Sequence, residues 1–122
     1  MKTIGLVLAV FAAIVAFASS PAHAGACFDW SCNSSTRACT FDASCSTASP
    51  YVWKYDFAFG DGSDTGLTGN AQQNHTYSSG FDAEVNLTIY FFSGTGSASV
   101  TCDIATHILP FGPQPPFSGR CQ

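Results

Sequence analysis

Charged residues are scarce in this sequence. They make up 10% of its 122 residues, and Lys and Arg together number 4 against 8 Asp and Glu. A chain with so few basic residues lacks the positive surface to which nucleic acids and acidic membranes bind. No stretch shows the 3.6-residue periodicity of an amphipathic helix, which argues against a helical bundle. We therefore expect a small acidic domain that binds no nucleic acid.

Motifs for nucleophilic catalysis and for zinc binding are also missing. No G-x-S-x-G nucleophile elbow occurs, so Asp61 and His75, the sharpest candidate pair for catalysis, have no nucleophile to complete a triad. No C-x-x-C pair occurs, and His75 and His107 lie at no spacing typical of zinc ligands. We expect no enzyme, no metal and no cofactor.

Residues 1–24 have the features of a secretory signal peptide. Lys2 supplies the positive start, an apolar run extends from Ile4 to Phe17, and Ala22-His23-Ala24 fits an A-x-A cleavage site. The run is shorter than the roughly twenty residues that span a bilayer, which favours cleavage after Ala24 over a membrane anchor. We expect a secreted or periplasmic protein with no membrane span after cleavage.

Six cysteines, all beyond the cleavage site, indicate disulfides, because export leads to an oxidising compartment. The runs Cys27–Cys32 and Ala38–Ala43 flank a polar turn and predict a β-hairpin. In an antiparallel hairpin, residues at equal distances from the turn lie opposite each other, and this places four of the cysteines in two opposed pairs. The two remaining cysteines are then left to bond with each other. Six cysteines allow many pairings, so the scheme is a hypothesis. Its disulfides are Cys32–Cys39, Cys27–Cys45 and Cys102–Cys121.

After the hairpin, β-prone runs alternate with clusters of Gly, Asn, Ser and Asp, the pattern of an antiparallel sandwich. One strand carries aromatic residues at every second position, and Asp61-Gly62 supplies the tight turn that ends it. Two later runs alternate in the same way and predict the last two core strands. The alternating residues are Tyr51, Trp53, Tyr55, Phe57 and Phe59, then Val85, Leu87, Ile89 and Phe91, then Ala98, Val100, Cys102 and Ile104.

Prolines recur between Leu109 and Cys121. Proline has no N–H to donate to a sheet, so this part of the chain predicts an extended tail. We expect the folded domain to span residues 25–108. The tail, residues 109–122, is expected to be held to the domain by Cys121 and by the rings of Phe111 and Phe117.

Several motifs follow one another along the chain: Phe57-Ala58-Phe59-Gly60-Asp61-Gly62, His75-Thr76-Tyr77, Gly80, and Val85-Asn86-Leu87-Thr88-Ile89. This series resembles the PKD domain of polycystins and secreted bacterial proteins, with its W-x-F-G-D-G, H-x-Y, glycine and V-x-L-x-V motifs. The likeness extends from Phe28 to Ile104 and implies an all-β, antiparallel, immunoglobulin-like β-sandwich of about seven strands. Phe57, Phe59, Gly60, Asp61, Gly62, His75, Tyr77 and Gly80 then have structural roles.

The chain departs from the family where some relatives bind calcium. Ser46-Thr47-Ala48-Ser49-Pro50 replaces their acidic S-D-P-D-G loop, and Phe57 replaces the family tryptophan. Calcium needs several oxygen ligands brought together, so the missing loop argues against the site. An alternative set of ligands consists of Asp56, Asp61, Asp64, Asp82 and Glu84, although such residues more often form a solvated surface.

Five further aromatic residues fall outside the core pattern and are candidate exposed rings: Trp30, Tyr51, Trp53, Tyr90 and Phe92. Exposed rings stack on the C–H faces of sugars, and the PKD resemblance also implies binding of polysaccharide or protein. The alternative is that these rings pack under loops and the tail. We expect a secreted, non-catalytic, monomeric binding module, or otherwise a structural spacer of the cell envelope without a defined ligand.

Overall fold

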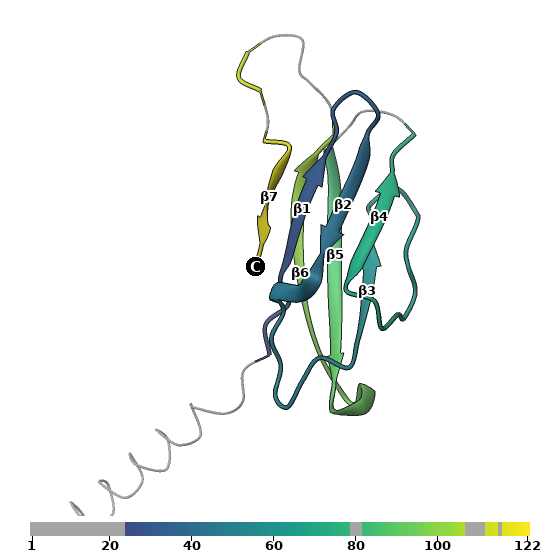
Figure 1. Ribbon diagram of the computed structural model, residues 1–122, viewed down its shortest axis with the longest axis vertical. Coiled ribbons are helices and arrows are strands. Elements are labelled where there is room, and N and C mark those ends of the chain that lie inside the picture. Colours follow the sequence, from purple (N-terminus) through teal and green to yellow (C-terminus); the bar gives the residue numbers. More distant parts are fainter. Residues whose placement is uncertain (1–23, 79–81, 107–111, 115) are drawn as a thin grey trace, which may run out of the picture.

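The computed structural model describes residues 24–78, 82–106, 112–114 and 116–122. Within these residues it contains two antiparallel sheets and no α-helix, which confirms the predicted all-β class. One sheet has the strand order β4-β2-β1-β7 and the other β3-β5-β6, and the two form the layers of a sandwich (Figure 1). The strands are β1 (Phe28–Cys32), β2 (Ala38–Asp42), β3 (Lys54–Ala58), β4 (Gln72–Thr76), β5 (Asp82–Phe91), β6 (Gly96–Ala105) and β7 (Ser118–Cys121).

The first hairpin forms in the predicted register. Cys32 of β1 lies opposite Cys39 of β2. Between them the side chain of Asn33 accepts hydrogen bonds from the backbone N–H groups of Ser35 and Thr36, at 2.9 and 3.1 Å. A side-chain acceptor of this kind replaces backbone partners in a turn, which explains why small polar residues occupy it.

All three disulfides of the predicted scheme are present. Cys32–Cys39 closes the hairpin, and Cys27–Cys45 joins its base to the short 3₁₀ turn η1 (Ala43–Cys45). Cys102–Cys121 links β6 to β7 and therefore crosses from one sheet to the other. These bonds restrict the unfolded chain, and in a domain of this size they offset the limits of a small core.

Aromatic rings from both sheets form the centre of the core. Phe28 on β1 meets Phe57 on β3 edge to face, with ring centroids 5.6 Å apart. Phe41 on β2 lies 5.7 Å from Phe57, so one ring from the smaller sheet contacts two from the larger. Each ring is at most 1% exposed, and burial of a side chain this large stabilises the fold by about 2–3 kcal/mol.

The hairpin of β5 and β6 supplies the longest strands. Their residues pair one to one from Asp82 with Ala105 to Phe91 with Gly96, without a bulge. Val85, Leu87 and Ile89 are fully buried, as their alternation predicts. The alternating residues of β6 are only half-buried as far as Cys102, because β6 is the last strand of its sheet.

Two element boundaries differ from the prediction. The aromatic strand begins only at Lys54, so Tyr51 and Trp53 precede it. The C-terminal segment is not only a tail, because Ser118–Cys121 pair with β1 and extend its sheet. The prolines all precede these four residues, whose backbone N–H groups are therefore free to join a ladder.

Three expectations concern residues outside the described ranges. The predicted signal sequence as far as position 23, Gly80 and the ring of Phe111 all fall there. Phe117, the other ring expected to hold the tail, is half-buried, and its carbonyl oxygen accepts a 2.7 Å hydrogen bond from the N–H of Cys32. Among the residues that are described, no helix has the length and apolar character to cross a membrane.

Candidate functional site

The motif that ends β3 brings Asp61 and His75 together. The Asp61 carboxylate lies 2.7 Å from Nε2 of His75. The imidazole ring is stacked on Phe59 at a centroid distance of 4.2 Å and lies perpendicular to the ring of Tyr77 at 4.7 Å. The hydroxyl of Tyr77 donates a 2.7 Å hydrogen bond to the carbonyl oxygen of Phe59. The rings that anchor the turn thus hold His75 in place, whereas Asp61 is exposed.

The hydrogen bonds of this cluster favour the ionised form of the Asp61 carboxylate. Burial raises the pKa of Asp61, but hydrogen bonds from His75 and Ser63 outweigh that effect and hold the pKa below its usual value. Burial raises the pKa of the Tyr77 hydroxyl, and the negative charge of Asp61 raises it further. Tyr77 therefore remains a neutral hydrogen-bond donor at physiological pH.

The turn itself requires two glycines. Gly60 and Gly62 have φ values of 87° and 91°, a backbone region that other residues rarely occupy. A Cβ atom on Gly60 would lie 2.5 Å from the carbonyl oxygen of Glu84, so β5 approaches the turn too closely for any side chain. The backbone N–H of Ser63 donates a 3.0 Å hydrogen bond to the carboxylate of Asp61 within the same turn. These contacts fit a structural role for the motif.

The acidic residues considered for calcium do not converge. Among the described parts of the chain, no group of three or more His, Cys, Asp and Glu residues has the spacing to hold a metal ion. Asp56 and Asp64 lie near each other, since burial and then the charge of Asp64 raise the pKa of Asp56. Asp61 instead faces His75, and Asp82 and Glu84 are exposed on β5.

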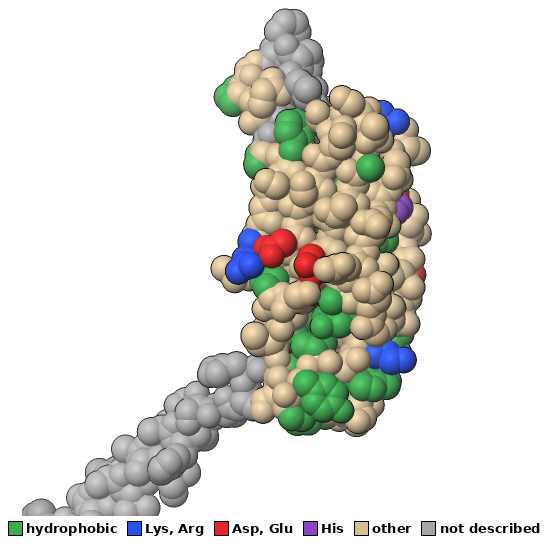
Figure 2. Space-filling view, viewed as in Figure 1, with side chains coloured by type: hydrophobic (Ala, Val, Ile, Leu, Met, Phe, Trp, Pro, Cys, Tyr) green, Lys and Arg blue, Asp and Glu red, His purple; other side chains and the backbone are tan. Residues whose placement is uncertain are grey.

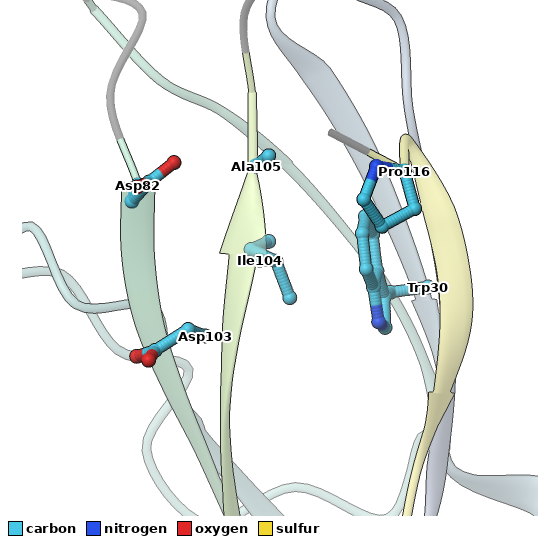
Figure 3. Close-up of a pocket in the computed structure, with 6 residues that line it drawn as sticks. All are labelled: Trp30, Asp82, Asp103, Ile104, Ala105 and Pro116. Carbon is cyan, nitrogen blue, oxygen red and sulfur yellow. The ribbon is translucent and has the colours of Figure 1, made fainter. Parts of the chain in front are cut away.

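One of the candidate exposed rings, Trp30, is buried, and its prediction is wrong. It is 8% exposed and lies on β1 between Phe28 and Cys32, which face the core at alternate positions. Figure 3 shows its indole ring across from Ile104 of β6, and Pro116 near one end of the indole; the three residues line a hollow of about 200 Å³. Asp103 lines the same hollow but its carboxylate points away from the indole.

The other four candidates lie on or beside the smaller sheet, and their exposure differs. Tyr51 is 58% exposed and Phe92 53% exposed. Trp53 and Tyr90 are half-buried, and the backbone N–H of Trp53 donates a 2.6 Å hydrogen bond to the carbonyl oxygen of Tyr90. The segment before β3 is thereby fixed to the end of β5, where the chain turns into β6.

That turn, η2 (Phe92–Gly94), has an unusual backbone. The φ values of Phe92, Ser93 and Gly94 are 51°, 55° and 96°, so three residues in succession are left-handed. Glycine adopts this conformation readily, whereas for an aromatic residue it costs about 1–2 kcal/mol. The strain occurs at the residue whose ring is exposed.

Neighbouring rings support this turn. Phe91 meets Phe92 edge to face at 5.1 Å. A Cβ atom on Gly94 would lie 3.0 Å from the Trp53 ring, so the indole packs directly on that glycine. Nζ of Lys54 lies 5.0 Å from the centroid of the same indole. Figure 2 shows hydrophobic side chains gathered at this end of the molecule beside a basic residue.

We call Trp53, Phe91 and Phe92 the ring patch, and the exposed Tyr51 precedes Trp53 by two residues. Sequence reasoning missed Phe91, which its alternation placed with the core residues, and the contact of Lys54 with Trp53. A signal was present, because Phe91 and Phe92 are adjacent and cannot both point inward from one strand. The glycines at positions 94 and 96 also mark the turn that follows these two residues.

The chain matches no protein-family model, no curated protein and no solved structure. Its function therefore has to be inferred from the geometry of the Asp61–His75 cluster and of the ring patch.

Proposed function

We propose that this protein is a secreted, non-catalytic binding module of PKD type that contacts polysaccharide or protein through the ring patch. The signal sequence and the three disulfides support export to the periplasm or beyond the cell. The Asp61–His75 pair belongs to the framework of the fold in this proposal, and the patch carries the function.

The strand order supports the PKD-type fold. Immunoglobulin-type sandwiches place their first, second and fifth strands in one sheet and their third, sixth and seventh in the other. The orders β4-β2-β1 and β3-β5-β6 follow this arrangement if the polar segment before β4 counts as the fourth strand, although its bridges from Asp64 and Thr68 join it to the edge of β3 and not to β4. The strand β7 is then an addition at the edge of β1.

The strained, exposed Phe92 is the observation that carries the functional proposal. A ring that is 53% exposed buries only about half of its surface, and its edge-to-face contact with Phe91 contributes about 0.5–1.5 kcal/mol. The left-handed backbone costs about 1–2 kcal/mol, which offsets a gain of this size and leaves the exposed ring with little net contribution to stability. Strained residues of this kind cluster at functional sites, where the ligand uses the side chain.

The surroundings of the patch favour a polysaccharide among the possible ligands. Flat rings offer apolar faces for sugar C–H groups, while hydroxyl groups of a sugar need polar partners beside them. The exposed side chain of Thr95 and the ammonium group of Lys54 lie next to the rings in sequence and provide such partners.

Phe92→Gly separates a binding role from a folding role. Glycine relieves the left-handed strain, so we expect unchanged or higher stability together with loss of binding to the ligand. Ser93→Gly is the matched control, because Ser93 has nearly the same φ but carries no ring. We expect Ser93→Gly to gain stability and retain binding.

The binding assay is co-sedimentation of the oxidised protein with insoluble chitin, cellulose and collagen. Retention on a polysaccharide that falls at least about tenfold in Phe92→Gly but not in Ser93→Gly supports the proposal. Retention on collagen alone would identify a protein ligand. No retention on any of the three, or loss of stability in Phe92→Gly, would favour the structural spacer.

A further inference from the structure

The outer edge of β6 is the longest strand edge that the described chain leaves uncovered. β6 has ten residues and pairs with β5 on one side only. The outer edge of β3, by contrast, is covered by bridges from Asp64 and Thr68. The other edge strands, β4 and β7, have five and four residues. A long free edge exposes a row of backbone N–H and C=O groups that another strand can pair with.

β6 carries few of the features that usually block such pairing. It contains no Lys and no Pro, and its unbroken register with β5 shows no bulge. Its only charged side chain is Asp103, near one end. The core-facing side chains of Ala98, Val100 and Cys102 are half-buried, whereas those opposite on β5 are fully buried. A strand added at this edge would cover Ala98 and Val100, whereas Cys102 is already bonded to Cys121 of β7.

We propose that β6 pairs antiparallel with β6 of a second copy of this chain, which joins the two smaller sheets into one continuous sheet. The distribution of charge favours this partner and this direction. With Val100 on the two-fold axis, Ser99 lies opposite Thr101, and Asp103 lies opposite Ser97. The two Asp103 carboxylates are then about 20 Å apart, whereas an in-register parallel pair would place them side by side.

The face of each side chain restricts the possible registers. Ser97, Ser99, Thr101 and Asp103 are exposed on the outer face of the sheet, and the residues between them face the core. A shift by one residue would bring core-facing positions opposite exposed ones, so only registers that match odd with odd positions are compatible. Ser and Thr pairs across strands also form favourable contacts.

Paired substitutions at positions 99 and 101 test both the association and its register. Ser99→Lys/Thr101→Lys places lysines opposite each other at two points of the dimer contact. We expect the dissociation constant of the dimer to rise at least about tenfold. Ser99→Lys/Thr101→Glu places Lys opposite Glu, and we expect association within about threefold of wild type. The two variants differ at one exposed position, which makes each the control for the other.

Association is measured by sedimentation equilibrium from about 1 μM to about 1 mM, with circular dichroism to check that each variant is folded. Hydrogen exchange in the outward-facing amides of β6 should slow as wild type associates. A wild type that remains monomeric to about 1 mM would overturn the proposal. A dimer that both variants form equally well would also overturn it, because the contact would then lie elsewhere.

Discussion

Replacing Gly60 with alanine probes how closely the turn after β3 approaches β5. Gly60 and Gly62 share nearly the same backbone conformation, with φ of 87° and 91°. An alanine in this region costs about 1–2 kcal/mol at either position. At Gly60 the new Cβ would also lie 2.5 Å from the carbonyl oxygen and 2.9 Å from the nitrogen of Glu84, whereas at Gly62 no atom lies within 4 Å.

Because of this clash, we expect Gly60→Ala to lose more stability than Gly62→Ala. Overpacking of this kind adds about 1–3 kcal/mol, so we expect a loss of about 2–5 kcal/mol for Gly60→Ala and about 1–2 kcal/mol for Gly62→Ala. Denaturant titration of the oxidised proteins measures both, and thermal unfolding should show a drop of about 4–8 °C per kcal/mol. Losses that agree within about 0.5 kcal/mol would show that the turn does not contact β5 as described.

Two further predictions concern the Asp61–His75 pair and the disulfide that holds β7. The lowered pKa of Asp61 means that its carboxylate stabilises the fold fully above the unfolded value of about 3.9, and that this stabilisation is lost as the pH falls through the folded value. Asp61→Asn should therefore differ most from wild type above pH about 4 and converge with it in stronger acid. A difference that stays constant from about pH 2 to 6 would contradict the pairing. Removing Cys102–Cys121 by a double alanine substitution opens a loop of 19 residues and should cost about 3 kcal/mol, with faster hydrogen exchange in β7; unchanged exchange there would show that pairing with β1 suffices to hold the strand.

Local patterns in the sequence predicted the parts of the fold that depend on near neighbours. The first hairpin has its two strands and its turn within about fifteen residues, so register and disulfide pairing follow from one turn. The alternation of Val85, Leu87 and Ile89 fixed the buried face of β5 for the same reason. The three disulfides could be proposed because two of them span this one hairpin region.

Features that depend on distant contacts were not predicted. β7 becomes a strand because β1 has a free edge, which no pattern within Ser118–Cys121 indicates. Trp30 was a candidate for an exposed ring, with packing under the tail as the alternative, although it shares the inward side of β1 with Phe28 and with the disulfide-bonded Cys32. That alternation was visible in the sequence, so this error could have been avoided.

The ring patch was predicted only in part, for a physical reason. Tyr51 and Phe92 are exposed as expected. Trp53 lies at the turn that carries Phe92 because η2 reverses the chain beside the segment that precedes β3. The left-handed backbone of Phe92 follows from no rule for aromatic residues. The sequence alone therefore indicated which aromatic residues lie outside the core pattern, but not that the η2 turn and the segment before β3 bring some of them to the same end of the molecule.

The most direct test of the ring patch uses the two tryptophans as opposed reporters. Trp53 packs on the η2 turn at the patch, whereas Trp30 is buried between β6 and β7. In ¹⁵N–¹H spectra the two indole N–H signals can be followed during titration with soluble chitin and cellulose oligosaccharides. We predict that the Trp53 signal shifts with saturation and that the Trp30 signal does not. A shift of Trp30 alone, or no shift of either signal with any oligosaccharide, would contradict a polysaccharide-binding site at the ring patch.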